Sequence, residues 1–253
     1  MNKMEHIQTK GIVLKEINVG ESDKILKVFT KLKGKISVSA KGAKKNKSHL
    51  AAGTQMFSYC DFLIYQGRNY NIIQQLEIIN TFHGIREDII KLTYASYFFE
   101  LLDSVLEEEQ VNEKLLLLTL RTLSVLEKTN RNPKLIAKIY ELRLMASIGY
   151  MPEIIQCVSC GKQEDIHRFS SRLGGVLCNH CSSKDVYSHM MSRGTWYTIQ
   201  YILSSDLSNL FKFNLDEKIL EELDRITQSY LSYHIERKFK TLDFLREIQD
   251  IYE

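Results

Sequence analysis

Apolar and polar residues alternate over several short segments within the first 80 residues. The clearest segment is Lys-Ile-Ser-Val-Ser-Ala at 35–40. A period of two places its three apolar side chains on one face of a β-strand, toward a core, and places Lys35 and the two serines on the other face. Further strands are expected at 11–17, 25–30, 57–65 and 70–79. Five short strands favour a small closed barrel, but they do not separate an OB-fold from an SH3-like barrel.

Beyond the predicted barrel, apolar residues recur every three or four positions, which is typical of amphipathic helices. One helix is predicted over about 90–105, and a second begins at about Asn112. Asn132 and Pro133 suit the N-cap and the first position of a third helix. Gly149 suits the end of that helix, because glycine readily takes the left-handed conformation that often closes a helix.

A Cys- and Gly-rich insert, with a short hairpin inside it, follows at about 152–186, and helical patterning resumes near Thr195. The chain is therefore predicted to be an α+β protein with two domains. The first, at 1–80, is the β-barrel. The second, at 81–253, is α-helical and carries the insert.

Four cysteines of the insert form two CxxC pairs separated by 17 residues: Cys157, Cys160, Cys178 and Cys181. Two such pairs can place four thiolates in a tetrahedron, which predicts one structural zinc ion per chain. Four protein ligands leave no open position for water or substrate. The alternative is a redox pair in a thiol-disulfide oxidoreductase, but the thioredoxin-like βαβ context is missing. Cys60 lies in a strand pattern and is expected to be a buried small hydrophobe.

Positive charge is concentrated at the start of the chain. Residues 1–80 hold 13 Lys/Arg and six Asp/Glu, a net charge of +7, whereas the remainder holds 21 and 25, a net charge of −4. Residues 31–47 include seven lysines and no acidic residue, most densely at 41–47. Beside a barrel, such a stretch predicts binding of single-stranded nucleic acid, with Arg68 and the tyrosines of the last two strands available for contacts. The alternative is a solvated loop that only confers solubility.

No apolar run approaches the roughly 18 residues of a membrane span, and the first residues lack the apolar segment of a signal peptide. The phosphate-loop, dinucleotide-binding, HExxH and GxSxG motifs are absent. We therefore expect a cytoplasmic protein that is not an enzyme, with no catalytic residues, no small-molecule substrate and no membrane partner.

Several motifs, in their order and spacing, resemble the RecO family of bacterial recombination mediators. They are Gly11-Ile12-Val13-Leu14, Gly20-Glu21-Ser22-Asp23-Lys24-Ile25-Leu26, Phe29-Thr30, Gly34-Lys35, Ala40-Lys41-Gly42-Ala43-Lys44-Lys45, Tyr140-Glu141-Leu142-Arg143-Leu144, Gly149-Tyr150-Met151-Pro152 and Gly174-Gly175-Val176-Leu177-Cys178. The similarity extends from about residue 10 to 181 and is weaker over the last 70 residues.

The resemblance implies an N-terminal OB-fold and a helical domain with a zinc knuckle. It also implies a DNA repair function: binding single- and double-stranded DNA, annealing complementary strands, and helping RecR to load RecA onto gaps coated with the single-strand binding protein SSB. Carried over to this chain, the residues that hold the DNA backbone are Lys35, Lys41, Lys44, Lys45 and Lys47. Because several relatives lack some of the cysteines, the resemblance makes zinc a stabilising device. A zinc-containing RNA-binding protein of the translation apparatus is the alternative.

Overall fold

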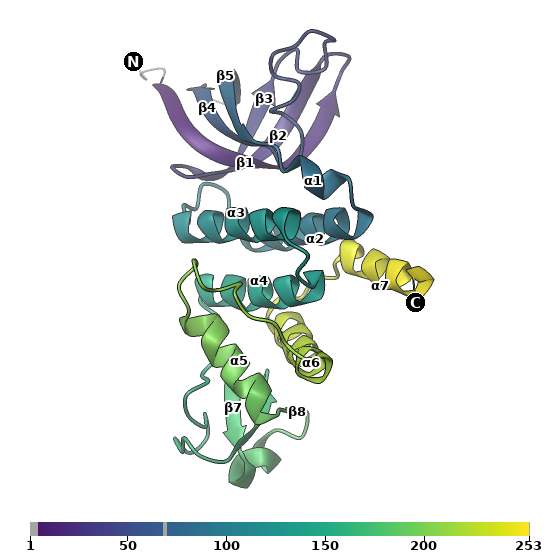
Figure 1. Ribbon diagram of the computed structural model, residues 1–253. Helices are drawn as coiled ribbons and strands as arrows, with labels where there is room; N and C mark the ends of the chain where they lie inside the picture. Colours follow the sequence, from purple (N-terminus) through teal and green to yellow (C-terminus); the bar gives the residue numbers. More distant parts are fainter. Residues whose placement is uncertain (1–4, 68–69, 253) are drawn as a thin grey trace. The chain divides into compact units, whose positions relative to one another are not determined.

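The computed structural model describes residues 5–67 and 70–252, and these fall into two compact units (Figure 1). The first unit comprises residues up to 92 together with 99–117, and the second comprises 93–98 and the residues from 118 onward. Helix α2 (Ile89–Val105) contributes to both units.

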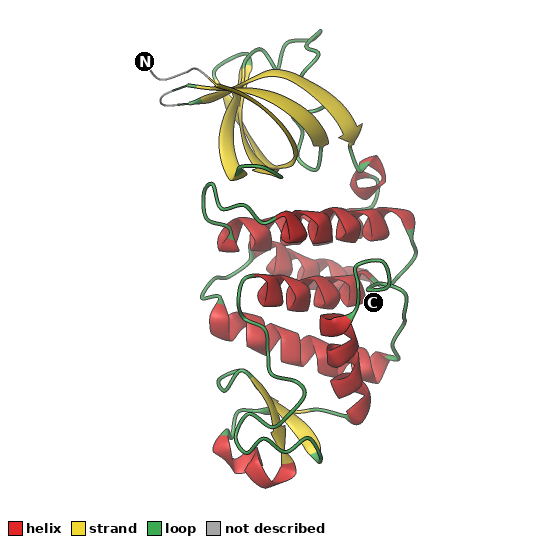
Figure 2. Ribbon diagram, turned by 90° about the vertical axis from the view of Figure 1, so that its left-hand side faces the viewer, coloured by secondary structure: helices red, strands yellow, loops and turns green. Residues whose placement is uncertain are grey.

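The first unit contains a closed barrel of five strands, seen as curved yellow arrows in Figure 2. The strands are β1 (Glu5–Val19), β2 (Asp23–Thr30), β3 (Gly34–Ala40), β4 (Tyr59–Gln66) and β5 (Asn71–Asn80). Their order around the barrel is β1-β2-β3-β5-β4. Every pair is antiparallel except β3 with β5, which is parallel and closes the barrel. The predicted N-terminal barrel is confirmed, and its topology is OB-like.

The alternation in β3 is confirmed for the core. Ile36, Val38 and Ala40 are buried among the apolar residues of the barrel interior, whereas Ser37 is exposed. Successive side chains of β3 therefore point to opposite faces of the strand, as the alternating sequence predicted.

Residues 107–110 lie along the first part of β3. The backbone N–H of Glu109 donates to the Lys35 carbonyl at 2.9 Å, and Glu108 forms a parallel bridge with Lys35. Gly34 has a φ of +63°, and a Cβ at this position would lie 2.2 Å from the Gln110 carbonyl oxygen. Only glycine fits here, because both the backbone conformation and the close approach exclude a side chain.

Besides α2, the described helices are α1 (His83–Arg86), α3 (Glu113–Lys128), α4 (Pro133–Ser147), α5 (Arg193–Ser204), α6 (Glu217–His234) and α7 (Lys240–Tyr252). Helices α2 and α4 begin and end close to the predicted positions, α3 begins next to Asn112 and α5 near Thr195 as expected, and α1 was not predicted. None of the helices in the described part of the chain has the length and apolar content required to cross a bilayer.

The predicted helix ends are confirmed. Asn112 Oδ1 accepts from the Leu115 N–H at 3.0 Å, and Asn132 Oδ1 caps α4 through the Lys134 N–H at 2.9 Å. Gly149 has a φ of +97° just after α4, and the next N–H, of Tyr150, returns to the Met145 carbonyl at 2.9 Å. This is the Schellman arrangement that ends many helices.

The second unit also holds a small sheet of order β7-β6-β8, built from Gly175–Cys178, Ile166–Ser170 and His189–Met190. Strands β6 and β7 form the expected hairpin within the insert, with Ser170 paired to Gly175. A short 3-10 helix, η1 (Asn179–Lys184), follows β7 directly.

A buried ion network holds α4 and α6 together in the second unit. Lys138 is only 3% exposed, and its Nζ donates to both carboxylate oxygens of Glu141 and to Asp224 Oδ1, each at 2.9 Å. The Tyr97 hydroxyl donates to Glu141 Oε1 at 2.9 Å, so the carboxylate has a second partner. Burial opposes the charged form of Lys138, but the charges and hydrogen bonds of the two carboxylates outweigh it and raise the pKa of its ammonium group.

Replacing Lys138 with Met should therefore destabilise the second unit strongly. The substitution leaves the buried Glu141 carboxylate without its cation, which costs about 3 to 5 kcal/mol of unfolding free energy. Urea denaturation at neutral pH measures the loss. Lys134→Met is the matched control, because Lys134 lies on the same helix and pairs with the other Asp224 oxygen at 2.9 Å, but its side chain is 35% exposed. The control should lose about 1 kcal/mol or less. Equal losses would contradict the assignment of the network to the core.

Candidate nucleic-acid interface and metal centre

The lysine-rich loop at 41–47 is fastened to the turn between β1 and β2. The Lys44 N–H donates to the Ser22 carbonyl at 2.9 Å, and Lys44 Nζ donates to the Gly20 carbonyl at 3.1 Å. The Gly42 N–H donates to the Asp23 carboxylate at 2.8 Å. The loop therefore has a defined place at one end of the barrel, next to the first hairpin turn.

Asp23 is the anchor of this loop. The Gly42 N–H is the main cause that lowers the pKa of its carboxyl group, followed by the Ser22 hydroxyl; burial opposes the shift, and the charges of Lys41 and Lys45 add to it. The carboxylate is ionised at neutral pH and holds the loop backbone, while the lysine residues of the loop are exposed to solvent.

Four of the lysines predicted to contact DNA are exposed on this loop. They are Lys41, Lys44, Lys45 and Lys47. The structure thus brings them together on one short segment beside the β1–β2 turn. In OB-folds the β1–β2 and β4–β5 loops and the face of the second and third strands bind oligonucleotides, so this placement is compatible with the predicted use.

Lys35 is different, and the sequence-based assignment of this residue to the DNA surface is corrected by the structure. Its side chain is buried, and its Nζ donates to the Asp103 carbonyl and to Asp103 Oδ1, each at 3.0 Å. Lys27 also pairs with this carboxylate, at 3.3 Å. Burial alone would raise the pKa of the Asp103 carboxyl, but the hydrogen bonds and charges of Lys35 and Lys27 have the larger effect. The pKa is therefore below its usual value. An ammonium group held in this way is not available to a phosphate.

The other residues predicted to be available for contacts with DNA differ in their exposure. Arg68 lies outside the described residues. Tyr59 and Tyr65 are half-buried, and the Tyr65 ring packs edge-on against His6 at 5.6 Å between centroids. Tyr70 is 61% exposed and presents most of its ring to solvent.

The sequence analysis missed an apolar pair on the outer face of the barrel. Ile17 and Ile25 are direct partners across β1 and β2, and they are 44% and 39% exposed. The next outward pair along the same two strands is Lys15 with Lys27. The signal was present in the sequence, because both isoleucines occupy outward positions in the strand alternation, where polar residues are usual.

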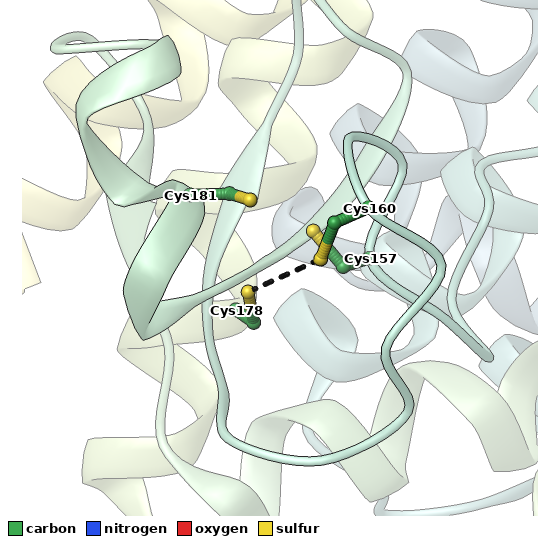
Figure 3. A group of neighbouring side chains, drawn as sticks. All are labelled: Cys157, Cys160, Cys178 and Cys181. Atoms are coloured by element: carbon green, nitrogen blue, oxygen red, sulfur yellow. Dashed lines mark hydrogen bonds between the residues drawn. The ribbon is translucent and has the colours of Figure 1, made fainter.

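The four cysteines of the insert converge in the second unit (Figure 3). Cys157 and Cys160 lie on one turn, closed by the Gly161 N–H donating to the Cys157 carbonyl at 2.8 Å. Cys178 ends β7, and Cys181 lies in η1. All four Sγ atoms lie within 4.8 Å of one another, and those of Cys160 and Cys178 are 3.7 Å apart.

This cluster fits a tetrahedral metal ion. An ion about 2.3 Å from each of four sulfurs separates those sulfurs by roughly 3.8 Å, close to the Cys160–Cys178 distance. Burial raises the pKa of the Cys157 thiol, but the backbone N–H groups of Cys178, Ser159 and Cys160, together with the Cys160 side chain, lower it to about 6. The thiolate form that binds metals is therefore favoured at neutral pH.

The arrangement of the cysteines gives less support to the alternative of a redox-active cysteine pair. All five cysteines are free, and the 3.7 Å contact between Cys160 and Cys178 joins sulfurs from different CxxC pairs. Cys60 is fully buried in the barrel, and burial raises the pKa of its thiol to about 12, which makes it inert. The prediction of a buried small hydrophobe at this position is confirmed.

Two family models cover most of the chain. The N-terminal model of recombination protein O matches residues 4–82, and the C-terminal model of the same protein matches residues 86–243. The chain belongs to the RecO family. The predicted resemblance is thus confirmed.

Full-length relatives agree with the family models. The chain is 38% identical to the DNA repair protein RecO of Acetivibrio thermocellus over 249 residues, covering 98% of this chain and 99% of the relative. It is 37% identical to the RecO of Alkaliphilus metalliredigens, covering 96% and 99%. It is 33% identical to that of Listeria innocua, covering 94% and 93%. These RecO relatives are named as DNA repair proteins, and the similarity runs through both units.

If this RecO family member binds single-stranded DNA as the sequence predicts, replacing Lys35 with Met should lower its stability without weakening that binding. The substitution removes the buried partner of Asp103 and should cost about 1 to 3 kcal/mol. Chemical denaturation and fluorescence anisotropy with a single-stranded oligonucleotide measure the two effects. Lys45→Met is the control with the opposite expectation: unchanged stability and weaker binding. If Lys35→Met weakens binding as much as Lys45→Met does, the correction made above for Lys35 is wrong.

Proposed function

We propose that the barrel of this RecO family member binds single-stranded DNA through the exposed lysines at 41–47 and the adjoining outer face of β1 and β2. The observation that carries the proposal is a loop with four exposed lysines whose backbone is held at the β1–β2 turn. Exposed apolar side chains at Ile17 and Ile25 lie on the neighbouring face and offer contact to bases. A positively charged groove with aromatic side chains for base stacking is the usual means of binding a single strand. The isoleucine pair would add apolar contact rather than stacking.

The proposed activity is non-covalent annealing of complementary strands. Two strands repel each other through their phosphates, and lysines that neutralise part of this charge let complementary bases meet. No catalytic residue is required. The family resemblance adds the setting: binding of double-stranded DNA as well, cooperation with RecR, contact with SSB, and loading of RecA onto SSB-coated gaps in the bacterial cytoplasm, at the nucleoid.

Reversing the charge of Lys44 and Lys45 tests this function. The variant Lys44→Glu with Lys45→Glu should anneal complementary strands at least about tenfold more slowly, since two phosphate contacts become repulsive. The measurement is a fluorescence assay of annealing on SSB-coated oligonucleotides. Circular dichroism and the metal content should be unchanged. The variant loses the Lys44 Nζ contact to Gly20, but Asp23 and the Ser22 carbonyl still hold the loop backbone.

The matched control reverses two exposed lysines of the second unit, Lys212 and Lys218, which changes the net charge by the same amount. It should retain annealing. A second readout is the salt dependence of binding: four phosphate contacts give a log–log slope of about −3 for single strands, and the Lys44/Lys45 variant should show a slope shallower by about 1 to 2. Unchanged annealing by the variant would reject the proposal. Stronger competition by RNA than by DNA would favour an RNA-binding protein instead.

We further propose that the metal held by Cys157, Cys160, Cys178 and Cys181 is zinc with a structural role. Four thiolates are the donor set typical of structural zinc, and complete protein ligation leaves no position for a substrate. When bound, the ion would join the turn at 157–160 to the end of the β6–β7 hairpin.

The thiols should be protected by the metal. Purified protein should contain one zinc per chain, and four thiols should react with a thiol reagent only after a chelator is added; Cys60 should react only after denaturation. Cys178→Ser should lose the metal, and Cys60→Ala should keep it. Four reactive thiols in the absence of chelator, or no zinc in fresh protein, would overturn the zinc assignment and favour a redox role.

A further inference from the structure

The barrel has a gap between β3 and β5. These strands are paired only at Val38 with Asn71 and at Ser39 with Ile72. Earlier in β3, residues 107–110 take the place of a neighbouring strand at Lys35. Between these two contacts a pocket of about 500 Å³ remains, a volume within the range of small-ligand sites.

Polar side chains and one exposed aromatic ring line this pocket. They are Ser37, Gln66, Tyr70, Asn71, Glu108 and Glu109. The Asn71 amide nitrogen donates to the Ser37 carbonyl at 3.2 Å, which holds the start of β5 beside β3. None of the described lining residues is a lysine or an arginine, and the two carboxylates repel phosphate. Of the parts of a bound DNA strand, the one that suits this lining is a base, which is uncharged, flat enough to lie against Tyr70 and able to offer hydrogen-bond donors to the carboxylates.

We infer that the pocket takes an unstacked guanine base of the bound single strand, and this inference rests on the proposed function of the barrel. The Watson–Crick edge of guanine carries two adjacent donors, N1–H and the N2 amine, which match the two oxygens of a carboxylate such as that of Glu108 or Glu109. Cytosine, adenine and thymine each offer a donor at only one atom of that edge. Stacking on Tyr70 is available to every base, so the carboxylates supply the preference.

The position of the pocket suits a strand held by the lysine loop. Ser37 and Lys41 are four residues apart along the end of β3, a distance of about 13 Å at the rise of a β-strand. A stretch of a few nucleotides of single-stranded DNA covers this distance. A single OB-fold covers about 4 to 16 nucleotides, so one short oligonucleotide can reach both features.

The test compares oligonucleotides of thymidine that carry one central guanine, inosine, adenine or cytosine. The complete protein should bind the guanine oligonucleotide about fivefold more tightly than the thymidine one, in fluorescence anisotropy at fixed salt. Inosine lacks the N2 amine and should lose most of this gain. The double variant Glu108→Gln with Glu109→Gln should abolish the preference, and Tyr70→Ala should weaken binding of every oligonucleotide that places a base there.

Glu107→Gln is the matched control, because Glu107 is exposed and precedes the two lining residues without lining the pocket. It should keep the guanine preference, and it corrects for the general effect of removing negative charge. Lys44→Glu with Lys45→Glu should weaken all oligonucleotides equally and leave their ratio unchanged. If wild-type protein binds all four bases alike, or prefers a base other than guanine, the pocket inference fails. The lysine variants decide the proposed function separately.

Discussion

The contact between Lys35 and Asp103 determines which part of the barrel surface is covered and which part stays open. Ile12, Phe29 and Lys35 form one row across β1, β2 and β3, and all three are buried. The row belongs to the outer face, where an unpartnered ammonium group would cost several kcal/mol if it were buried. Asp103 supplies the partner and fixes the end of α2 within the first unit. Two residues further along the strands, Lys27 still reaches Asp103, but Lys15 and Ser37 in the same row are exposed. In the following row Ile17 and Ile25 are exposed as well.

The burial of Lys35 against Asp103 could not be predicted from the sequence. A period of two identifies which side chains leave the barrel interior, and it did so correctly for all of β3. It does not tell whether the outer face meets water or another segment of the chain, because the covering residues lie about 70 positions away. Lys35 and Lys45 belong to the same lysine-rich stretch, which contains no acidic residue. Their different environments depend on Asp103 and on the backbone of residues 107–110, which only the folded chain brings near.

The family motif at Tyr140-Glu141-Leu142-Arg143 is a second case. As sequence it identified the family without revealing the role of any side chain. In the structure Glu141 belongs to the buried ion network, and the Arg143 guanidinium donates to the carbonyls of Ile202, Leu203 and Ser205 at the end of α5. These residues assemble the second unit. Part of the signature that identifies a DNA repair family therefore reflects packing and hydrogen bonding within the helical unit.

The cysteine cluster was predictable because its geometry is local. A CxxC turn places two sulfurs together through hydrogen bonds within a few residues, and the hairpin brings the second pair alongside. The two halves are also joined without a metal: the Glu153 N–H donates to the Gly174 carbonyl and the Val158 N–H to the Val176 carbonyl, each at 2.9 Å. A bound ion would add a cross-link to a segment that already has backbone connections of its own. The lysine loop is held within the other unit by Asp23 and the β1–β2 turn, so none of the contacts that position it passes through the cysteines. Replacing the cysteines of this chain should accordingly lower the local stability of the insert and leave in place the side chains that we propose to contact DNA.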